Sequence, residues 1–310
     1  MPDLLILGPQ ARSPNLSPCL AAAGMTGPIA AITAGWQERE AELAALEEHV
    51  GAAVQDLRLY ARAEDVFAGD RAYHDAYRER QAALREAQDL YRLQLEHARA
   101  AARELYRAHP ATRALRRARI EAIAALRRLD ASHLASIDAT HRRFERRWRT
   151  EQRPAIARHR EELDRIVAAA STVLIAGGHV AVLINRLRLF GMQALLEGRS
   201  IAAWSAGAMA LTARVLLFHD RPPQGAGAAE VFEQGLGLLP DAVFLPHAAK
   251  RLALDDPERT ALLARRMRPA GCYTLDEGDW LWFRDGVLRA GAGSRRLPRA
   301  GSRAVDRGAA

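Results

Sequence analysis

The chain is poor in cysteine and lysine and contains no long apolar run. Its two cysteines, Cys19 and Cys272, provide neither a disulfide framework nor a thiolate metal site. No apolar run reaches the roughly 18 residues of a membrane span, and no basic segment precedes the short apolar stretch Leu4–Leu7, as a signal peptide would require. We therefore expect a cytoplasmic protein without a membrane partner, and nothing in the sequence indicates a metal or a cofactor.

Arginine carries almost all of the positive charge, because Lys250 is the only lysine among 45 basic residues. The net charge is +8, and residues 61–170 contribute +7 of it, with 24 arginines against 17 acidic residues. Within this segment the arginines are interleaved with acids three or four positions away, as on a solvated helix surface with ion pairs. The excess charge therefore does not indicate a nucleic-acid partner.

Two regions, residues 1–61 and 170–296, alternate short apolar runs with helical stretches, which is typical of an α/β sheet. In the first region we expect a helical stretch from Gln37 to Ala53 and strands at Leu4–Leu7, Ile29–Thr33 and Leu57–Tyr60. In the second we expect a helix over residues 180–197 and strands at Thr172–Ile175, Ile201–Trp204, Val215–Phe218, Ala242–Leu245, Cys272–Leu275, Trp280–Phe283 and Val287–Ala290. Residues 297–310, rich in Arg, Gly, Ser and Pro, are expected to form a disordered tail.

Residues 62–169 have the pattern of amphipathic helices, with apolar residues at steps of three and four. The two series are Leu84, Ala87, Tyr91, Leu95, Ala98, Ala102 and Leu105, then Ile120, Ile123, Leu126, Leu134, Ile137, Phe144 and Trp148. His109-Pro110 separates them, because the residue before a proline disfavours helix. The sequence thus predicts an α/β core interrupted by a long antiparallel helical hairpin, with a third helix over residues 154–170. The apolar stripe favours a homodimer through this insertion.

Ser205 is the residue most indicative of chemistry. It directly follows the apolar run Ile201–Trp204 and precedes Ala206-Gly207-Ala208, which open a helical stretch. A strand that turns sharply into a helix at a serine, among small residues, has the layout of a nucleophile elbow. The helix N-terminus beyond it offers free backbone N–H groups to a developing oxyanion.

Partners for a serine nucleophile occur at the ends of other expected strands, where active sites of open α/β sheets assemble. His247 follows one strand and is the candidate base, because an imidazole exchanges protons near neutrality; His219 is the alternative. Glu277, Asp276 and Asp220 are the three acids placed to orient the histidine. Gly177-Gly178 follows a strand as well, and together with the N–H of Ala206 these glycines are candidates for an oxyanion hole.

Four segments in this order carry a family resemblance: Gly177-Gly178-His179, Ala203-Trp204-Ser205-Ala206-Gly207-Ala208, Leu245-Pro246-His247 and Leu275-Asp276-Glu277-Gly278-Asp279-Trp280. In order and approximate spacing they resemble the aspartyl dipeptidase and cyanophycinase family of serine peptidases. The resemblance covers about residues 1–60 and 170–295. It implies a flavodoxin-like, class I glutamine amidotransferase-like fold, with a mostly parallel sheet and helices on both faces.

The resemblance also implies the roles of individual residues. Ser205 would be the nucleophile, His247 the general base and Glu277 the orienting acid, while Gly178 and Ala206 would supply the oxyanion N–H groups. Gly177, His179 and Asp220 would lie near the substrate. The chain departs from the family where His179 replaces the usual asparagine and Ala203 the usual glycine, and the helical insertion has no counterpart in the short dipeptidases.

These observations predict a serine-type peptidase or dipeptidase that acts through an acyl-enzyme on a small or acidic peptide-like substrate. Arginines of the insertion, or Arg186 and Arg188, are candidates for binding a substrate carboxylate. The alternative is a catalytically silent core whose helical insertion serves protein–protein interaction or dimerisation.

Overall fold

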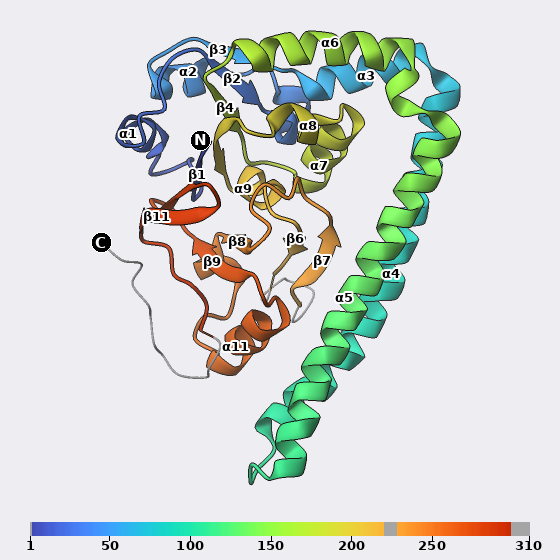
Figure 1. The fold of residues 1–310 in the computed structure, drawn as a ribbon, viewed down its shortest axis with the longest axis vertical. Coiled ribbons are helices and arrows are strands. Elements are labelled where there is room, and N and C mark those ends of the chain that lie inside the picture. Colours follow the sequence, from blue (N-terminus) through green and yellow to red (C-terminus); the bar gives the residue numbers. More distant parts are fainter. Residues whose placement is uncertain (1, 220–227, 299–310) are drawn as a thin grey trace.

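The computed structural model describes residues 2–219 and 228–298, which form a mixed α/β fold around a seven-stranded sheet (Figure 1). The order in the sheet is β11-β10-β1-β5-β4-β2-β3. The neighbouring strands β1, β5, β4, β2 and β3 run parallel to one another, whereas β10 is antiparallel to both β1 and β11. The strands are β1 Asp3–Leu7, β2 Ile29–Ile32, β3 Val54–Asp56, β4 Thr172–Ile175, β5 Ser200–Trp204, β10 Trp280–Arg284 and β11 Val287–Ala292. The predicted fold class, a mostly parallel sheet with a long helical stretch, is confirmed.

Both faces of the sheet are buried, which explains why its central strands are nearly continuous apolar runs. Along β1, Leu4 and Ile6 belong to the larger hydrophobic cluster, whereas Leu5 and Leu7 belong to the smaller one. The helices of the core are α1 Leu16–Ala22, α2 Ala44–Val50, α7 Val180–Leu189, α8 Met192–Leu196 and α9 Ala206–Ala210, with the 3-10 helix η1 Ala34–Arg39.

Strands from residues 215–275 form two smaller sheets. One pairs β6 Val215–Leu217 with β7 Glu230–Glu233 in antiparallel register, and the other pairs β8 Ala242–Pro246 with β9 Gly271–Leu275 in parallel register. Helices α10 Ala248–Arg251 and α11 Pro257–Arg266 connect the strands of the second sheet.

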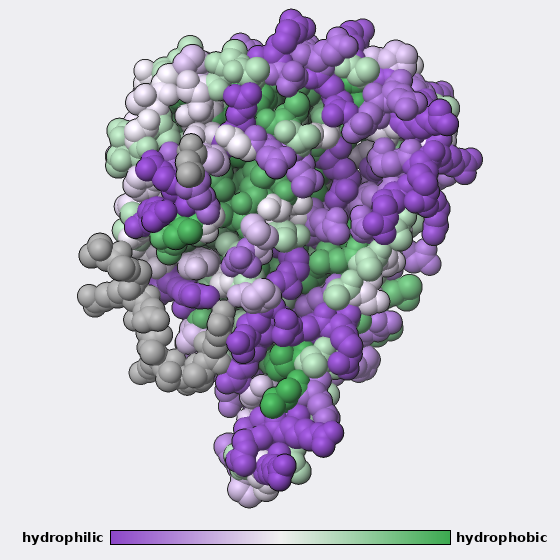
Figure 2. All heavy atoms as spheres, viewed as in Figure 1, coloured by the Kyte–Doolittle hydropathy of each residue, from purple (hydrophilic) through white to green (hydrophobic). Residues whose placement is uncertain are grey.

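The helical stretch consists of α3 Leu59–Gly69, α4 Arg71–Arg107, α5 Arg113–Trp148, η2 Thr150–Gln152 and α6 Pro154–Ala169. Helices α4 and α5 pack as a long antiparallel pair along one side of the molecule, and their tip extends beyond α11 (Figure 1). The break between them falls at His109-Pro110, as predicted. The tip, at the bottom of the view in Figure 2, is mostly hydrophilic. The division of the chain into an insertion and a core as separate domains stays a prediction.

Three expectations about local structure are wrong. The helical stretch expected from Gln37 to Ala53 is divided into η1, which ends at Arg39, and α2, which covers Ala44–Val50. Leu57–Tyr60 does not form the expected strand, and α3 begins at Leu59, because the Glu40 carboxylate accepts hydrogen bonds from the backbone N–H groups of Tyr60 (2.8 Å) and Ala61 (2.9 Å). The helix expected over residues 180–197 is divided at Gly191, whose φ of 62° ends the helical path.

The C-terminal tail was expected to begin at Leu297. Leu297 is buried, and its N–H donates to the Cys272 carbonyl at 2.8 Å. Residues 299–310 lie outside the described residues, so the expected disorder stays a prediction. Among the described residues, no helix is both long and apolar enough to cross a bilayer. The expected cytoplasmic location stays a prediction.

Candidate active site

Ser205 lies at the turn between β5 and α9, in a backbone conformation that non-glycine residues rarely adopt. Its φ is 51° and its ψ is −115°. Such strain persists only where the surrounding structure over-determines it, and it is concentrated at functional sites. The turn brings the serine to the wall of a cavity of about 1110 Å³. This is the geometry that a nucleophile elbow requires.

The residues around the turn are small because backbone segments approach it closely. A Cβ on Gly207 would lie 2.1 Å from the carbonyl oxygen of Ile175, at the end of β4. A Cβ on Gly178 would lie 2.3 Å from the Gly35 carbonyl oxygen, and the φ of Gly178 is 116°. Gly207 thus permits α9 to pack directly against the end of β4, and Gly178 permits the loop after β4 to pack directly against η1.

His247 directly follows β8 and lines the same cavity as Ser205. Its φ of 57° is also in the left-handed region, and its backbone N–H donates to the Leu275 carbonyl at 2.9 Å. Burial, followed by the cations of Arg251 and Lys250, lowers the pKa of the His247 ring below its usual 6.5. Among the described residues, no hydrogen bond joins this ring to the Ser205 hydroxyl. The alternative base, His219, is exposed and lines the cavity as well.

The predicted orienting acids are placed differently from one another. Glu277 is exposed and does not line the cavity, and the structure shows no hydrogen bond between it and His247 in the part of the chain that it describes. The Asp276 carboxylate accepts from the Ala249 N–H at 3.0 Å, next to His247. Both carboxylates raise the pKa of His247, against the larger effects of burial and the neighbouring cations. Asp220 lies outside the described residues.

The predicted oxyanion donors flank Ser205. Gly177, Gly178 and Ala206 all line the cavity, and within the described residues the N–H groups of Gly178 and Ala206 donate no hydrogen bond. His179 does not line the cavity. Its N–H donates to Gly35 at 2.8 Å, and its Nδ1 accepts from the Val182 N–H at 3.3 Å, so the ring caps α7.

Arg186 and Arg188, expected as carboxylate binders, are occupied elsewhere. Arg186 pairs with Glu64 at 3.0 Å and Arg188 with Glu233 at 3.4 Å, and neither lines the cavity. Arg251 lines it instead, four residues after His247. This position could not be predicted from the sequence, because the path of the chain after β8 determines which side chains line the cavity.

The helical insertion forms part of the cavity wall. Four residues of α4 line the cavity, namely Arg92, Leu95, Glu96 and Arg99. The remaining wall is largely apolar and includes Trp36, Trp204, Met209, Leu216 and Phe218. No group of three or more metal-ligating side chains occurs among the described residues.

Comparisons with known proteins find a matching family model and similar solved structures. The family model described as "Peptidase family S51" matches residues 127–290 of the chain. Among solved structures, a peptidase from an acI-B1 Actinobacterium is similar, with 14% identity over 97% of this chain and 92% of that one and a TM-score of 0.45. A putative peptidase E from Listeria monocytogenes EGD-e shares 16% identity over 44% of this chain and 65% of that one, with a TM-score of 0.30. No curated protein matches the chain.

Proposed function

From the premise that the chain belongs to peptidase family S51 and is a serine peptidase, we propose that it hydrolyses small or acidic peptides through an acyl-enzyme on Ser205. This proposal rests mainly on one observation. Ser205, in a strained turn at a strand end, and His247, after another strand, line one cavity. A hydroxyl and an imidazole in one cleft can act as nucleophile and base once a bound substrate brings them within hydrogen-bond reach.

In the proposed reaction, His247 accepts the proton of the Ser205 hydroxyl as Oγ attacks the peptide carbonyl carbon. The carbonyl oxygen becomes an oxyanion, which the N–H groups of Gly178 and Ala206 stabilise by hydrogen bonds. The imidazolium then protonates the departing amine, and an acyl-enzyme forms. Water, deprotonated by His247, hydrolyses this ester and releases the acid product.

An orienting carboxylate completes the proposed mechanism by stabilising the imidazolium. The family resemblance favours Glu277, while Asp276 and Asp220 remain the alternatives. We expect Glu277→Gln to lower kcat by at least about a hundredfold if Glu277 is the orienting residue, since loss of this group misorients the base. Asp276→Asn and Asp220→Asn, assayed in parallel, would identify the acid if Glu277→Gln retains wild-type kcat.

The proposed preference for acidic substrates rests on Arg251. Its guanidinium lines the cavity, and it makes no hydrogen bond or ion pair with any described residue. A guanidinium free to form a bidentate pair is well suited to a substrate carboxylate. We expect Arg251→Met to raise KM for peptides with an acidic residue more than for their amide counterparts.

A fluorophosphonate probe tests the nucleophile directly, since it reacts covalently with activated serines. We expect labelling of the wild type and of Ser136→Ala, which removes an exposed hydroxyl on α5. Ser205→Ala should remain unlabelled, and His247→Gln should react at least about a hundredfold more slowly, because general-base assistance contributes this much. A folded wild type that resists the probe would end the proposal.

A homodimer through the insertion is a second proposal, with a separate basis. Three large apolar side chains of the α4–α5 pair are exposed: Leu90 by 58%, Leu93 by 57% and Ile120 by 71%. We expect light scattering to report twice the monomer mass for the wild type and the monomer mass for the double variant Leu90→Glu/Leu93→Glu. A monomeric wild type would refute this proposal and leave the peptidase proposal intact.

A further inference from the structure

One face of α4 is turned toward the proposed catalytic cavity. Arg92, Leu95, Glu96 and Arg99 line it, and their spacing of three, one and three residues places them along a single side of the helix. Ser205 and His247 line the same cavity. A peptide bound at Ser205 would therefore lie in a space that the insertion helps to enclose.

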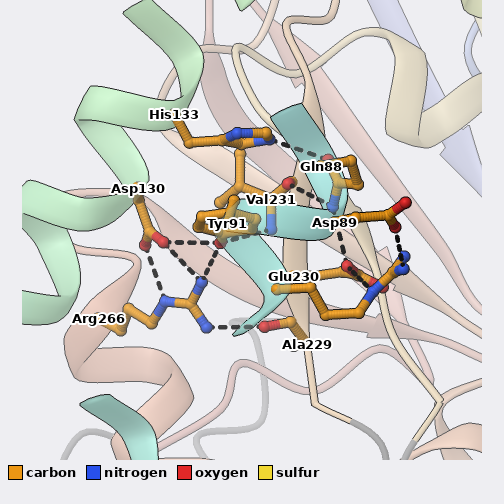
Figure 3. Close-up of polar contacts among 10 residues, drawn as sticks. Gln88, Asp89, Tyr91, Asp130, His133, Ala229, Glu230, Val231 and Arg266 are labelled. Carbon is orange, nitrogen blue, oxygen red and sulfur yellow. Dashed lines mark hydrogen bonds and ion pairs between the residues drawn. The ribbon is translucent and has the colours of Figure 1, made fainter. Parts of the chain in front are cut away.

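A buried polar cluster fixes α4 in this position (Figure 3). Arg266 of α11 donates two hydrogen bonds to the Asp130 carboxylate of α5, at 2.6 and 2.7 Å. The Tyr91 hydroxyl of α4 donates to Asp130 at 2.8 Å and accepts from Arg266 at 2.7 Å and from the Val231 N–H at 3.0 Å. One hydroxyl thus joins α4 to α5, α11 and β7, and such fully satisfied networks rigidify their surroundings.

A second set of contacts pairs Arg92 of α4 with carboxylates next to the cavity. The Arg92 guanidinium donates to Glu230 at 3.0 and 3.3 Å and to Asp89 at 2.9 Å. Gln88 donates to the same Glu230 carboxylate at 2.8 Å and pairs with His133 at 2.9 Å. Glu230 is therefore neutralised and held in place.

Glu96 differs from Glu230 in this respect. It is exposed to the cavity that it lines, and it makes no hydrogen bond or ion pair with any described residue. Because its carboxylate is not engaged by the protein, it can accept hydrogen bonds from a bound cation. The rigid attachment of α4 means that little reorganisation would accompany binding.

We propose that Glu96 is a specificity-determining residue that binds a cationic group of the peptide substrate, either its free α-ammonium or a basic side chain. This inference rests on the proposed function and adds the insertion to the substrate site. Arg251 lines the same cavity, and its guanidinium, like the Glu96 carboxylate, makes no hydrogen bond or ion pair with any described residue. Together they are complementary to the two charged ends of a short peptide.

Protection of Ser205 from a fluorophosphonate tests the inference without requiring turnover. The probes are the dipeptides Asp-Leu, N-acetyl-Asp-Leu and N-acetyl-Lys-Leu, and the readout is the concentration of each that halves the labelling rate. We expect at least one cationic dipeptide to protect the wild type at about tenfold lower concentration than N-acetyl-Asp-Leu, as a charge-assisted hydrogen bond provides. Asp-Leu and N-acetyl-Lys-Leu distinguish the α-ammonium from the side chain.

The decisive comparison is between Glu96→Gln and Glu86→Gln, which each remove one carboxylate from α4. Glu96→Gln should abolish the preference for the cationic dipeptide, and the charge-reversing variant Glu96→Lys should reverse it. Glu86→Gln removes an exposed carboxylate of α4 that does not line the cavity and should keep the preference unchanged. A wild type that is labelled but shows no preference, or a preference that survives in Glu96→Gln, would overturn this inference alone. A wild type that is not labelled would overturn the proposed function, and the inference with it.

Discussion

Gly177 lies against Ser205 so closely that a Cβ added to the glycine would be 2.9 Å from the serine Cβ. Real Cβ atoms essentially never come this near to a side-chain carbon. The backbone of the loop after β4 therefore packs directly against the Ser205 side chain, and the position of the serine depends on the absence of a side chain at Gly177.

Gly177→Ala should consequently displace Ser205 and impair its reactivity. We expect the rate of fluorophosphonate labelling to fall by about a hundredfold, since misplacement of a reacting group by about 1 Å has effects of this size. Gly69→Ala is the control, because a Cβ there meets nothing within 4 Å. If Gly177→Ala is labelled as fast as the wild type, the contact does not position the serine.

The pH dependence of the reaction should report the environment of His247. The ring acts as a base only when neutral, and its pKa lies below 6.5 because burial and then the Arg251 and Lys250 cations disfavour the imidazolium. We therefore expect kcat/KM to rise with pH through an apparent pKa below 6.5 and to stay high above it.

Removing one of these cations should shift that profile. Arg251→Met takes away a positive charge that opposes protonation, so the pKa of His247 rises and the acidic limb of kcat/KM moves to higher pH. Arg39→Met, which removes an exposed guanidinium from outside the cavity, should leave the limb in place. A limb that moves to lower pH in Arg251→Met would contradict this interpretation.

The central strands and the Ser205 turn could be predicted because their signals are local. Burial on both faces makes β4 a continuous apolar run, and the predicted strand Thr172–Ile175 has the observed bounds. The turn after β5 was likewise indicated by a serine among small residues, which the close backbone contacts of Gly207 explain.

Other features depend on partners that are distant in the sequence. β7 was not predicted because Glu230 and Glu233 give it a polar appearance, yet Gln88 and Arg92 bind Glu230, and His141 binds Glu233 at 2.8 Å. Arginines of the insertion were expected near the substrate, but the residues of α4 that line the cavity were not predicted, for the same reason. A helix with polar residues on several faces does not indicate which face meets the core.

Asp279 should make stability fall as pH rises. Burial raises its pKa to about 6 from an ordinary 3.8, so the folded state favours the protonated acid, and stability is lost between these two values as pH increases. In Asp279→Asn the amide oxygen can still accept the hydrogen bond that Asp276 N–H donates at 2.7 Å, without a charge. We expect this variant to be more stable than the wild type at pH 8, by at most about 3 kcal/mol.

Urea unfolding at pH 4 and pH 8 measures this effect, and the difference between wild type and variant is the relevant quantity because other groups titrate in both. Asp241→Asn removes the same charge from an exposed position and should show no such pH-dependent difference. An Asp279→Asn variant that is equally stable relative to the wild type at both pH values would refute the assignment.

The Asp130–Arg266 pair should be a strong determinant of the attachment of the insertion to the core. Both side chains are nearly inaccessible, with 2% and 4% exposed. Asp130→Asn leaves the guanidinium buried without its counter-charge, and we expect a loss of about 3 kcal/mol in the free energy of unfolding. Glu121→Gln breaks the exposed ion pair with Arg117 on the same helix and should change stability by less than about 0.5 kcal/mol.

The double variant Asp130→Leu/Arg266→Met separates the cost of an unpaired charge from the value of the pair itself. Because burying two charges carries a desolvation penalty, apolar replacement of both should destabilise less than Asp130→Asn alone. The Tyr91 hydroxyl would keep its hydrogen bond from Val231 in this variant, so α4 should stay in place and Ser205 should still be labelled. A double variant that folds and is labelled, but loses the substrate preference attributed to Glu96, would show that the ion pair also sets the exact placement of the cavity wall.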